Sequence, residues 1–319
     1  MKLVVLERNS VGTDVDVSCY EKFGEVEYYP NTVAENTAER VKDADIVIVN
    51  KAPMNESTLK DAPNVKLICL FATGFDNVDL AYCKSRGIKV ANVVNYSTAA
   101  VVQHTILLAL ALEEKLVHYD NYVKSGEYGA QDRFSNFDRP FRELAGKTWG
   151  IVGMGNIGRG VARVAQAMGC KVIFYSASGN STCTEYERVE LDVLFAQSDI
   201  LSLHCPLSDR TRGLINKEAF SKMKQSAVLV NVARGPVVDT QALYEALTRG
   251  QIAAAGLDVL EKEPISRDNP LNEIKDSTKL IITPHLAWAS TEARERLVDE
   301  VVKNIQAFLE GEDRNIVNK

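Results

Sequence analysis

Short apolar runs, rich in Val and Ile, recur along the whole chain and are separated by segments of helical period. The runs occupy residues 3–6, 46–49, 65–71, 88–90, 149–152, 172–175, 200–203, 227–232, 253–257 and 280–282. Runs of this length and composition are typical of parallel strands buried on both faces. Helical period is clearest within residues 161–168, 189–195, 240–247 and 297–308. This alternation predicts an α/β protein with doubly wound parallel sheets.

Length and charge narrow the class of protein further. The 319 residues correspond to two domains at roughly 150 residues per domain. The net charge of −6 gives no general attraction to a polyanion, so we expect no nucleic-acid partner. The longest apolar run, residues 105–112, is far shorter than the ~20 residues that cross a bilayer. The first residues reach a charge after four apolar positions, so we expect neither export nor membrane insertion.

Cysteine and histidine spacing bears on the compartment and on metal binding. The six Cys form no CxxC pair, which indicates reduced thiols and a cytoplasmic protein. The four His are far apart and form neither HxH nor HExxH. We therefore expect no metal site.

A helical stretch from about residue 97 to 123 is roughly twice the mean helix length and predicts a helix that bridges two domains. Residues 125–140 then carry loop-forming Gly, Asn, Asp and Pro. We place one domain at residues 1–99 and a second at 100–286. The last helix, with Ser290 as N-cap and Glu292 in its first turn, fits either unit, and we assign residues 287–319 to the first.

A glycine-rich turn follows the strand predicted at residues 149–152. Gly153, Gly155 and Gly158 form GxGxxG between a strand and a helix. In that context the first glycine permits a tight turn, the second lets backbone approach a pyrophosphate, and the third lets the helix lie close to the strand. The amides of Asn156 and Ile157 open the helix, whose positive end faces the phosphates. The alternative is a glycine-rich packing turn, but the strand–turn–helix context favours dinucleotide binding.

The acidic residue that normally binds the adenosine ribose is absent. An Asp or Glu is expected about 20 residues beyond the first glycine, and Ser176 occupies that position. A hydroxyl can form one hydrogen bond with the ribose but does not repel a 2′-phosphate. No Arg or Lys follows before Arg188. We therefore expect NAD as cofactor, with appreciable use of NADP.

Three further motifs lie in the second half of the chain. They are Asn231-Val-Ala-Arg-Gly-Pro, Gly256-Leu-Asp-Val-Leu-Glu-Lys-Glu-Pro and Thr283-Pro-His-Leu-Ala-Trp-Ala-Ser. Together with Gly74-Phe-Asp-Asn-Val-Asp, they closely resemble the D-isomer-specific 2-hydroxyacid dehydrogenase family, and most of all its glycerate dehydrogenases, or hydroxypyruvate reductases. The resemblance implies catalytic Arg234, Glu263 and His285, with Asp258 near the nicotinamide carboxamide. It also implies cofactor contacts at Val232 and Ala233, and a homodimer.

The chemistry of a 2-oxo acid calls for the same residue types. Hydride transfer leaves an oxyanion at C2 that must be protonated, and His titrates nearest physiological pH. A carboxylate such as Glu263 would orient His285, and the Arg234 fork can bind the substrate carboxylate. Each residue also has a structural alternative: His285 as a strand cap, Glu263 as a solvated charge, and Arg234 in a loop salt bridge. Their joint occurrence in matching motifs favours the functional interpretation.

The first domain offers a substrate-binding loop. Thr73, Gly74 and Phe75 follow a predicted strand, where backbone amides could hold a carboxylate, although a simple turn before the helix near Val78 is the alternative. Members of the family that the chain resembles commonly carry a small residue or Tyr near Phe75, so we expect its ring to set the size of the pocket. Lys51 ends another strand and lines the cleft or is solvated.

The sequence therefore predicts a flavodoxin-like substrate domain and a Rossmann cofactor domain. The resemblance implies reversible hydride transfer between a nicotinamide and a small D-2-hydroxy acid, and we expect D-glycerate with hydroxypyruvate, or glyoxylate, as the substrate. One alternative is a bulkier aliphatic 2-oxo acid as substrate. Another is a dinucleotide-sensing, corepressor-like binding protein. Formate dehydrogenase chemistry is disfavoured because that relative pairs its His with Gln, whereas Glu263 stands here.

Overall fold

The computed structural model describes residues 1–319. The chain divides into two compact units. The first comprises Met1–Ser97 together with Ala289–Lys319, and the second comprises Thr98–Trp288. No helix is long and apolar enough to cross a membrane.

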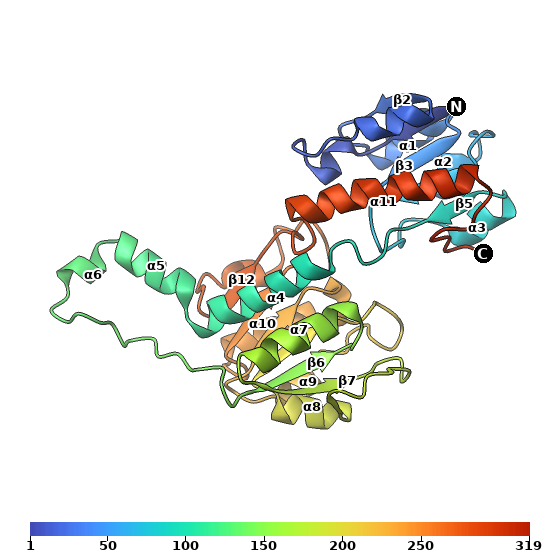
Figure 1. Cartoon of the computed structure of the whole chain (residues 1–319). Coiled ribbons are helices and arrows are strands. Elements are labelled where there is room, and N and C mark those ends of the chain that lie inside the picture. Colours follow the sequence, from blue (N-terminus) through green and yellow to red (C-terminus); the bar gives the residue numbers. More distant parts are fainter. The chain divides into compact units, whose positions relative to one another are not determined.

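The first unit is built around a sheet of parallel strands (Figure 1). Its strands are β1 (Lys2–Val5), β2 (Glu25–Tyr28), β3 (Ile46–Val49), β4 (Leu67–Leu70) and β5 (Lys89–Ala91). Their order in the sheet is β2-β1-β3-β4-β5, the flavodoxin-like order. The predicted fold class is confirmed for this unit.

Helices cover this sheet and bury its apolar side chains. They are α1 (Ala34–Val41), α2 (Glu56–Leu59), α3 (Leu80–Ser85) and α11 (Thr291–Leu309), with 3-10 turns η1 (Arg8–Val11) and η2 (Ser18–Phe23). The Ser290 side chain caps α11 by accepting from the Ala293 amide. On the buried face of α11, the side-chain Nδ2 of Asn304 donates to the backbone carbonyl of Asn92 at 2.9 Å. The last helix therefore packs on the first unit.

The second unit contains a larger parallel sheet. Its strands are β6 (Thr148–Val152), β7 (Lys171–Tyr175), β8 (Glu187–Arg188), β9 (Ile200–Leu203), β10 (Val228–Asn231), β11 (Ala254–Leu257) and β12 (Leu280–Ile282). They lie in the order β12-β11-β10-β9-β6-β7-β8. The order reverses between β6 and β9, which is the topological switch point of a Rossmann fold, where ligands bind.

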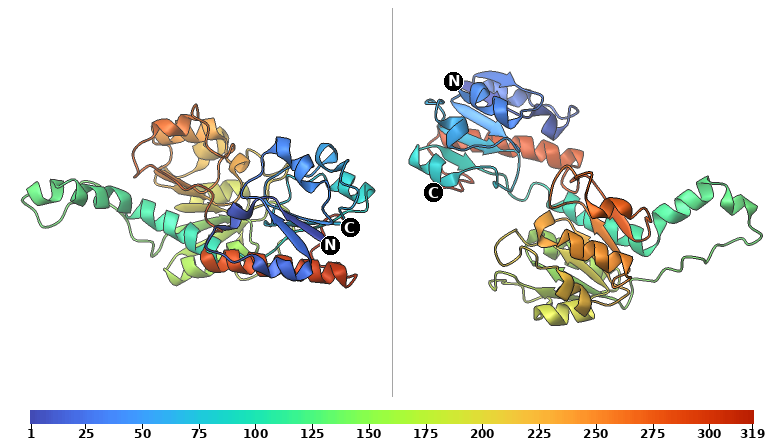
Figure 2. Two further views of the ribbon diagram at one scale, coloured as in Figure 1. Left: turned by 90° about the horizontal axis from the view of Figure 1, so that it is seen from above. Right: turned by 180° about the vertical axis from the view of Figure 1, so that it is seen from behind.

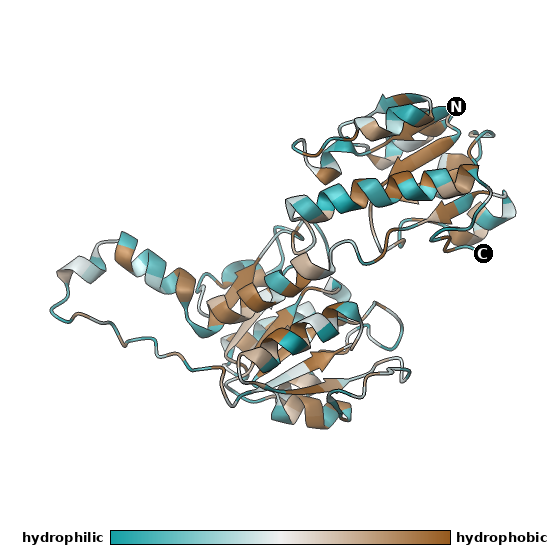
Figure 3. Ribbon diagram, in the orientation of Figure 1, coloured by the Kyte–Doolittle hydropathy of each residue, from teal (hydrophilic) through white to brown (hydrophobic).

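Two groups of helices cover the two faces of this sheet. The helices are α4 (Thr98–Glu113), α7 (Asn156–Ala167), α8 (Leu191–Gln197), α9 (Lys217–Lys222) and α10 (Thr240–Thr248), with η3 (Gly235–Val237) and η4 (Pro270–Glu273). Leu108 of α4 and Val161 of α7 belong to one buried cluster. Phe195 of α8 and Phe220 of α9 belong to the other. The central strands between them are apolar, as the brown ribbons in Figure 3 show.

The structure adds two strands that the sequence analysis missed. Both β2 and β8 lie at an edge of their sheet. An edge strand has a neighbour on one side only and is covered less completely than a central strand. Charged residues therefore occur in these strands: Glu25 and Glu27 alternate with apolar residues in β2, and Glu187 begins β8. No continuous apolar run marks either strand.

The single helix expected over residues 97–123 is wrong. The chain breaks at Lys115, whose φ of 55° is left-handed, and continues as α5 (Leu116–Lys124) and α6 (Glu127–Ala130). The Lys115 ammonium donates to the Leu112 carbonyl at 2.8 Å, which satisfies one helix-end acceptor. α4 packs against the sheet, whereas α5 buries no residue, so no shared packing surface keeps the two helices in line.

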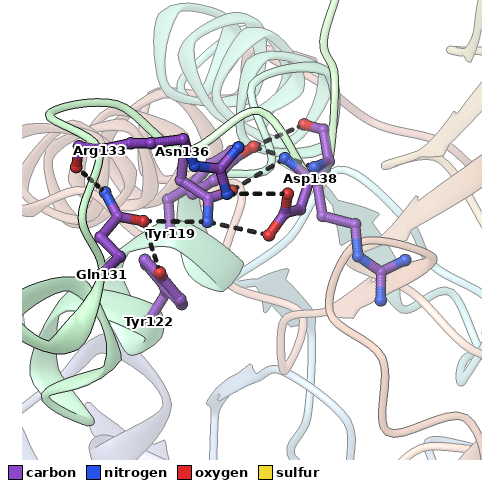
Figure 4. Close-up of polar contacts among 7 residues, drawn as sticks. Tyr119, Tyr122, Gln131, Arg133, Asn136 and Asp138 are labelled. Carbon is purple, nitrogen blue, oxygen red and sulfur yellow. Dashed lines mark hydrogen bonds and ion pairs between the residues drawn. The ribbon is translucent and has the colours of Figure 1, made fainter.

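We call residues 116–143 the arm. Figures 1 and 2 show α5, α6 and the chain that follows extending away from the rest of the second unit. Polar contacts hold the arm together (Figure 4): the Tyr122 hydroxyl donates to Gln131 Oε1 at 2.8 Å, and Asn136 Nδ2 donates to Asp138 Oδ2 at 3.1 Å. Its local structure therefore rests on its own side chains rather than on the sheet.

Candidate active site

The glycine-rich turn connects β6 to α7. Gly153 has a φ of 96°, and a Cβ there would lie 2.9 Å from backbone atoms of His204 and Cys205. A Cβ on Gly158 would lie 2.2 Å from the Gly153 carbonyl oxygen. Around Gly155, by contrast, nothing lies within 4 Å of that position. The turn is therefore packed tightly against β9 but open at its middle glycine, as a pyrophosphate site requires.

The first turn of α7 supplies amides at this opening. The helix begins at Asn156, followed by Ile157, and its N-cap is Gly155, which has no side chain to cap them. A helix N-terminus without a side-chain cap retains donors and a positive dipole end for an anion. These residues fit the pyrophosphate of a dinucleotide.

His204 lies at the end of β9, beside this turn, and the sequence analysis did not assign it a role. Its Nε2 lies 3.0 Å from Ser202 Oγ, which also accepts from the Trp149 indole at 2.9 Å. The Nδ1 atom is buried without a hydrogen-bond partner. Burial lowers the pKa of His204 to about 3. The only sequence signal was its place after a strand next to the switch point.

Ser176 lies directly after β7 and is 6% exposed. Its hydroxyl lies 3.5 Å from the hydroxyl of Ser178. No carboxylate stands at this position, where an acidic residue normally binds the ribose. The sequence has no Arg or Lys between Ser176 and Arg188, but two arginines contact this loop in the fold. Arg159 donates to Thr182 Oγ1 at 3.4 Å, and Arg188 donates to the Gly179 carbonyl at 3.0 Å. Both arginines are brought to the loop by the fold.

His285 and Glu263 form an ion-pair contact at the carboxyl ends of β11 and β12. His285 Nδ1 lies 2.6 Å from Glu263 Oε2, and Glu263 Oε1 accepts from the Leu260 amide at 2.9 Å. Both side chains remain about one third exposed, at 30% and 33%. The carboxylate engages Nδ1, so the ring is oriented and Nε2 is the atom left for proton exchange.

Asp258 holds the loop that carries His285. Its side chain is buried, at 2% exposure. It accepts from the Leu286 amide at 2.9 Å and the Ala287 amide at 2.8 Å. Its backbone carbonyl accepts from the His285 amide at 2.9 Å. His285 has a φ of 55°, a conformation that costs energy in a non-glycine residue, so these bonds offset that cost.

A buried network extends from Asp258 to α4. The Thr283 hydroxyl donates to Asp258 Oδ1 at 2.6 Å, and His104 Nε2 lies 2.9 Å from the same hydroxyl. Since that hydroxyl has one hydrogen, it accepts from His104 Nε2–H. Burial lowers the pKa of His104, against the opposing influence of the Asp258 carboxylate, so the ring is neutral at pH 7.

Arg234 follows β10 and is held in a tightly packed loop. Asn231 Nδ2 donates to the Arg234 carbonyl at 3.0 Å, and Asn231 Oδ1 accepts from the Ala233 amide at 3.0 Å. Val232 packs partly buried on the core. A Cβ on Gly235 would lie 2.0 Å from the Leu260 carbonyl oxygen. The loop of Arg234 and the loop of Glu263 therefore touch backbone to backbone.

The predicted substrate loop lies at the carboxyl ends of β3 and β4 in the first unit. The Thr73 hydroxyl donates to the Val93 carbonyl at 2.7 Å, Gly74 follows it, and the Phe75 side chain is exposed. Lys51 lies in a turn and is exposed. Its backbone amide donates to the Glu7 carboxylate at 2.8 Å. Glu7, which the sequence analysis missed, follows β1 and fixes that turn.

The second unit thus brings together an oriented imidazole, a carboxylate, a guanidinium and a phosphate-binding turn at one edge of its sheet. This set can bind a dinucleotide, bind a carboxylate and exchange a proton. No group of three or more His, Cys, Asp or Glu side chains is arranged to hold a metal ion.

Comparisons with known proteins agree with these features. Residues 106–287 match the family model described as D-isomer specific 2-hydroxyacid dehydrogenase, NAD binding domain. The chain is 42% identical to a hydroxypyruvate reductase of Blautia hydrogenotrophica, over 100% of both chains. It is 40% identical to a glycerate dehydrogenase of Methylorubrum extorquens, over 99% of this chain and 98% of the other.

A solved structure shows the same fold with a cofactor. The D-lactate dehydrogenase of Aquifex aeolicus, complexed with NAD and lactic acid, superposes with a TM-score of 0.83 at 33% identity, over 98% of this chain and 96% of the other. The two parallel-sheet units are therefore those of an established enzyme architecture.

Proposed function

Since the chain belongs to the D-isomer specific 2-hydroxyacid dehydrogenase family, and is thus an NAD(P)-dependent oxidoreductase, we propose that it interconverts D-glycerate and hydroxypyruvate, or reduces glyoxylate. The observation that carries this proposal is the 2.6 Å contact between His285 and Glu263, on a sheet edge shared with Arg234 and the glycine-rich turn. The similarity to a hydroxypyruvate reductase and a glycerate dehydrogenase supports the substrate class.

Each side chain has a role in this reaction. A bound nicotinamide supplies or accepts the hydride at C2 of the substrate. His285 gives a proton to the C2 oxygen on reduction and takes it back on oxidation, while Glu263 holds the ring through Nδ1. Arg234 binds the substrate carboxylate with its planar fork and polarises the keto oxygen.

The second unit holds the cofactor. We assign residues 100–286 to cofactor binding, with the pyrophosphate at Gly155, Asn156 and Ile157. Asp258 positions the loop that follows β12 and, through it, His285. Its contact with the nicotinamide carboxamide remains part of this proposal. Residues 1–99 and 287–319 form the substrate domain.

Initial rates with four 2-oxo acids test the substrate. Hydroxypyruvate, glyoxylate, pyruvate and 2-oxoisocaproate are each measured with NADH and with NADPH. We expect the highest kcat/KM with hydroxypyruvate or glyoxylate. A maximum with 2-oxoisocaproate would establish the bulkier aliphatic substrate instead, in which case Phe75 does not limit the pocket. Tight NADH binding without turnover of any acid would favour the dinucleotide-sensing binding protein.

We also propose a cytoplasmic homodimer that uses the arm. The arm exposes Phe134, Phe137 and Phe141 at 89%, 71% and 54%. Large aromatic side chains so exposed mark an association surface, and a second copy would cover them. Sedimentation velocity of the wild type and of Phe134→Ser/Phe137→Ser tests the dimer. A monomeric wild type at micromolar concentration excludes it.

The cysteines support the cytoplasmic compartment. All six are free thiols, which suits a reducing environment.

A further inference from the structure

We propose that Arg159 and Arg188 form a binding site for the 2′-phosphate of NADPH, so that this chain binds NADPH more tightly than NADH. The proposal rests on the dinucleotide site described above, with Ser176 facing the adenosine ribose. The glycine-rich turn and the end of β7 are neighbours in the fold, since Gly153 donates its amide to the Tyr175 carbonyl at 3.0 Å. α7 and β7 accordingly lie beside each other in Figure 1.

The loop after β7 carries hydroxyls and no acid. Ser176 and Ser178 stand where a carboxylate would accept from the ribose hydroxyls. Such a carboxylate would also repel a 2′-phosphate, so its absence removes the main barrier to NADPH. The hydroxyls of both serines can donate to phosphate oxygens.

Two guanidinium groups contact this loop, one from a residue before Ser176 in the sequence and one from a residue after it. Arg159 lies in the first turn of α7 and donates to Thr182 Oγ1 at 3.4 Å, a long and weak bond. Arg188 lies in β8 and donates to the Gly179 carbonyl at 3.0 Å. Each of these bonds uses one of the five donors of a guanidinium, so donors remain for a phosphate.

Neither guanidinium is neutralised by a carboxylate. The acid next to Arg188, Glu187, is paired instead with Lys171 at 2.9 Å. Glu185 is the other acid of this segment, and it lies beside Tyr186. Two cations without a carboxylate partner, both in contact with a loop that carries two serine hydroxyls, are the chemistry that recognises a phosphate monoester.

Direct binding separates the 2′-phosphate from the rest of the cofactor. Dissociation constants are measured by calorimetry at low salt for NADPH, NADH, adenosine 2′,5′-bisphosphate and 5′-AMP. The last two ligands lack the nicotinamide and differ only in the 2′-phosphate. We expect NADPH and the bisphosphate to bind at least about tenfold more tightly than NADH and 5′-AMP, because even one charged hydrogen bond contributes roughly that factor.

Three variants locate the effect. Arg159→Gln and Arg188→Gln should each weaken the bisphosphate severalfold and leave 5′-AMP unchanged. Arg163→Gln is the matched control, because Arg163 is an exposed arginine one turn further along α7 and should change neither ligand. Ser176→Asp should reverse the preference, since a carboxylate repels the phosphate.

The outcomes distinguish this inference from the proposed function. Equal or tighter binding of NADH in the wild type overturns the 2′-phosphate site but leaves the dehydrogenase intact. Equal weakening by Arg163→Gln would show a general charge effect and also overturn it. If neither dinucleotide binds, the assignment of the cofactor site is wrong, and so is the proposed function.

Discussion

At the scale of the residue, the site is determined by how side chains fix one another. Glu263 orients His285, while Asp258 holds its backbone in a left-handed conformation. A buried Asp with backbone donors on both oxygens is costly to replace, because each donor left unpaired loses about 1–3 kcal/mol. The proposed proton donor therefore depends on neighbours more than 20 residues away in sequence.

We expect His285→Ala to lower kcat by about 10²–10⁴, the usual contribution of a positioned acid–base group. Cofactor affinity should not change. Steady-state rates on the best 2-oxo acid and NADH titration of the same protein measure both quantities. His118→Ala, on α5 in the arm, is the control and should retain wild-type turnover. Near-normal kcat in His285→Ala would exclude this residue as the acid.

Arg234→Lys keeps the positive charge and removes the planar fork. Because one ammonium cannot make the bidentate contact with a carboxylate, we expect KM for the 2-oxo acid to rise and kcat to fall together. Saturation kinetics with hydroxypyruvate give both constants. If KM is unchanged, another group binds the substrate carboxylate.

At the scale of the element, the site depends on close approach of loops at the carboxyl edge of the sheet. β10, β11 and β12 are adjacent, so the loops that follow them are forced together. Gly235 permits the loop of Arg234 to touch the loop of Glu263. Strand order thus converts three distant motifs into one site.

Gly235→Ala should separate these loops. The added Cβ would lie 1.9 Å from the Leu260 carbonyl carbon, so backbone must move at a cost of about 1–3 kcal/mol. We expect a lower free energy of unfolding and a reduced kcat, measured by urea unfolding and steady-state rates. Gly129→Ala, with nothing within 4 Å, should change neither. Wild-type activity in Gly235→Ala would show that the loops adapt without affecting the site.

At the scale of the whole molecule, stability depends on two separately packed units. Each sheet has its own buried clusters, so the two units can unfold in separate transitions rather than in one two-state step. Both Trp residues, Trp149 and Trp288, belong to the second unit. Their fluorescence therefore reports the unfolding of that unit alone.

Acid should destabilise the second unit. Burial lowers the pKa of His204 to about 3 and also lowers that of His104, while unfolded His titrates near about 6.5. Below that pH the unfolded chain binds more protons, so stability is lost as pH falls from 6.5 toward 3. At pH 5.5 His204 alone contributes a loss of about 1.4 kcal/mol.

Urea unfolding followed by Trp fluorescence at pH 7.5 and 5.5 measures this loss. His204→Gln keeps a polar partner for Ser202 and cannot titrate. Its loss of stability between the two pH values should be smaller than that of the wild type by about 1.4 kcal/mol. An identical pH dependence in both proteins would show that His204 does not remain neutral in the folded state.

The sequence by itself determined the central strands, the phosphate-binding turn and the family. Parallel strands buried on both faces must be continuously apolar, so runs such as residues 46–49 and 200–203 are visible without a structure. The glycine spacing at 153, 155 and 158 reflects local sterics of one turn. Such features depend on neighbours in sequence, and a sequence records them directly.

Only the tertiary structure decided which distant groups meet. The edge strands β2 and β8, the break at Lys115 and the burial of His204 depend on what the fold covers and what it leaves open. Arg159 precedes Ser176 and Arg188 follows it, so sequence spacing does not pair them, yet both contact the chain between Gly179 and Thr182. Contacts between residues far apart in the chain form only when the sheet order is known, because hydrophobic periodicity predicts elements but not their neighbours.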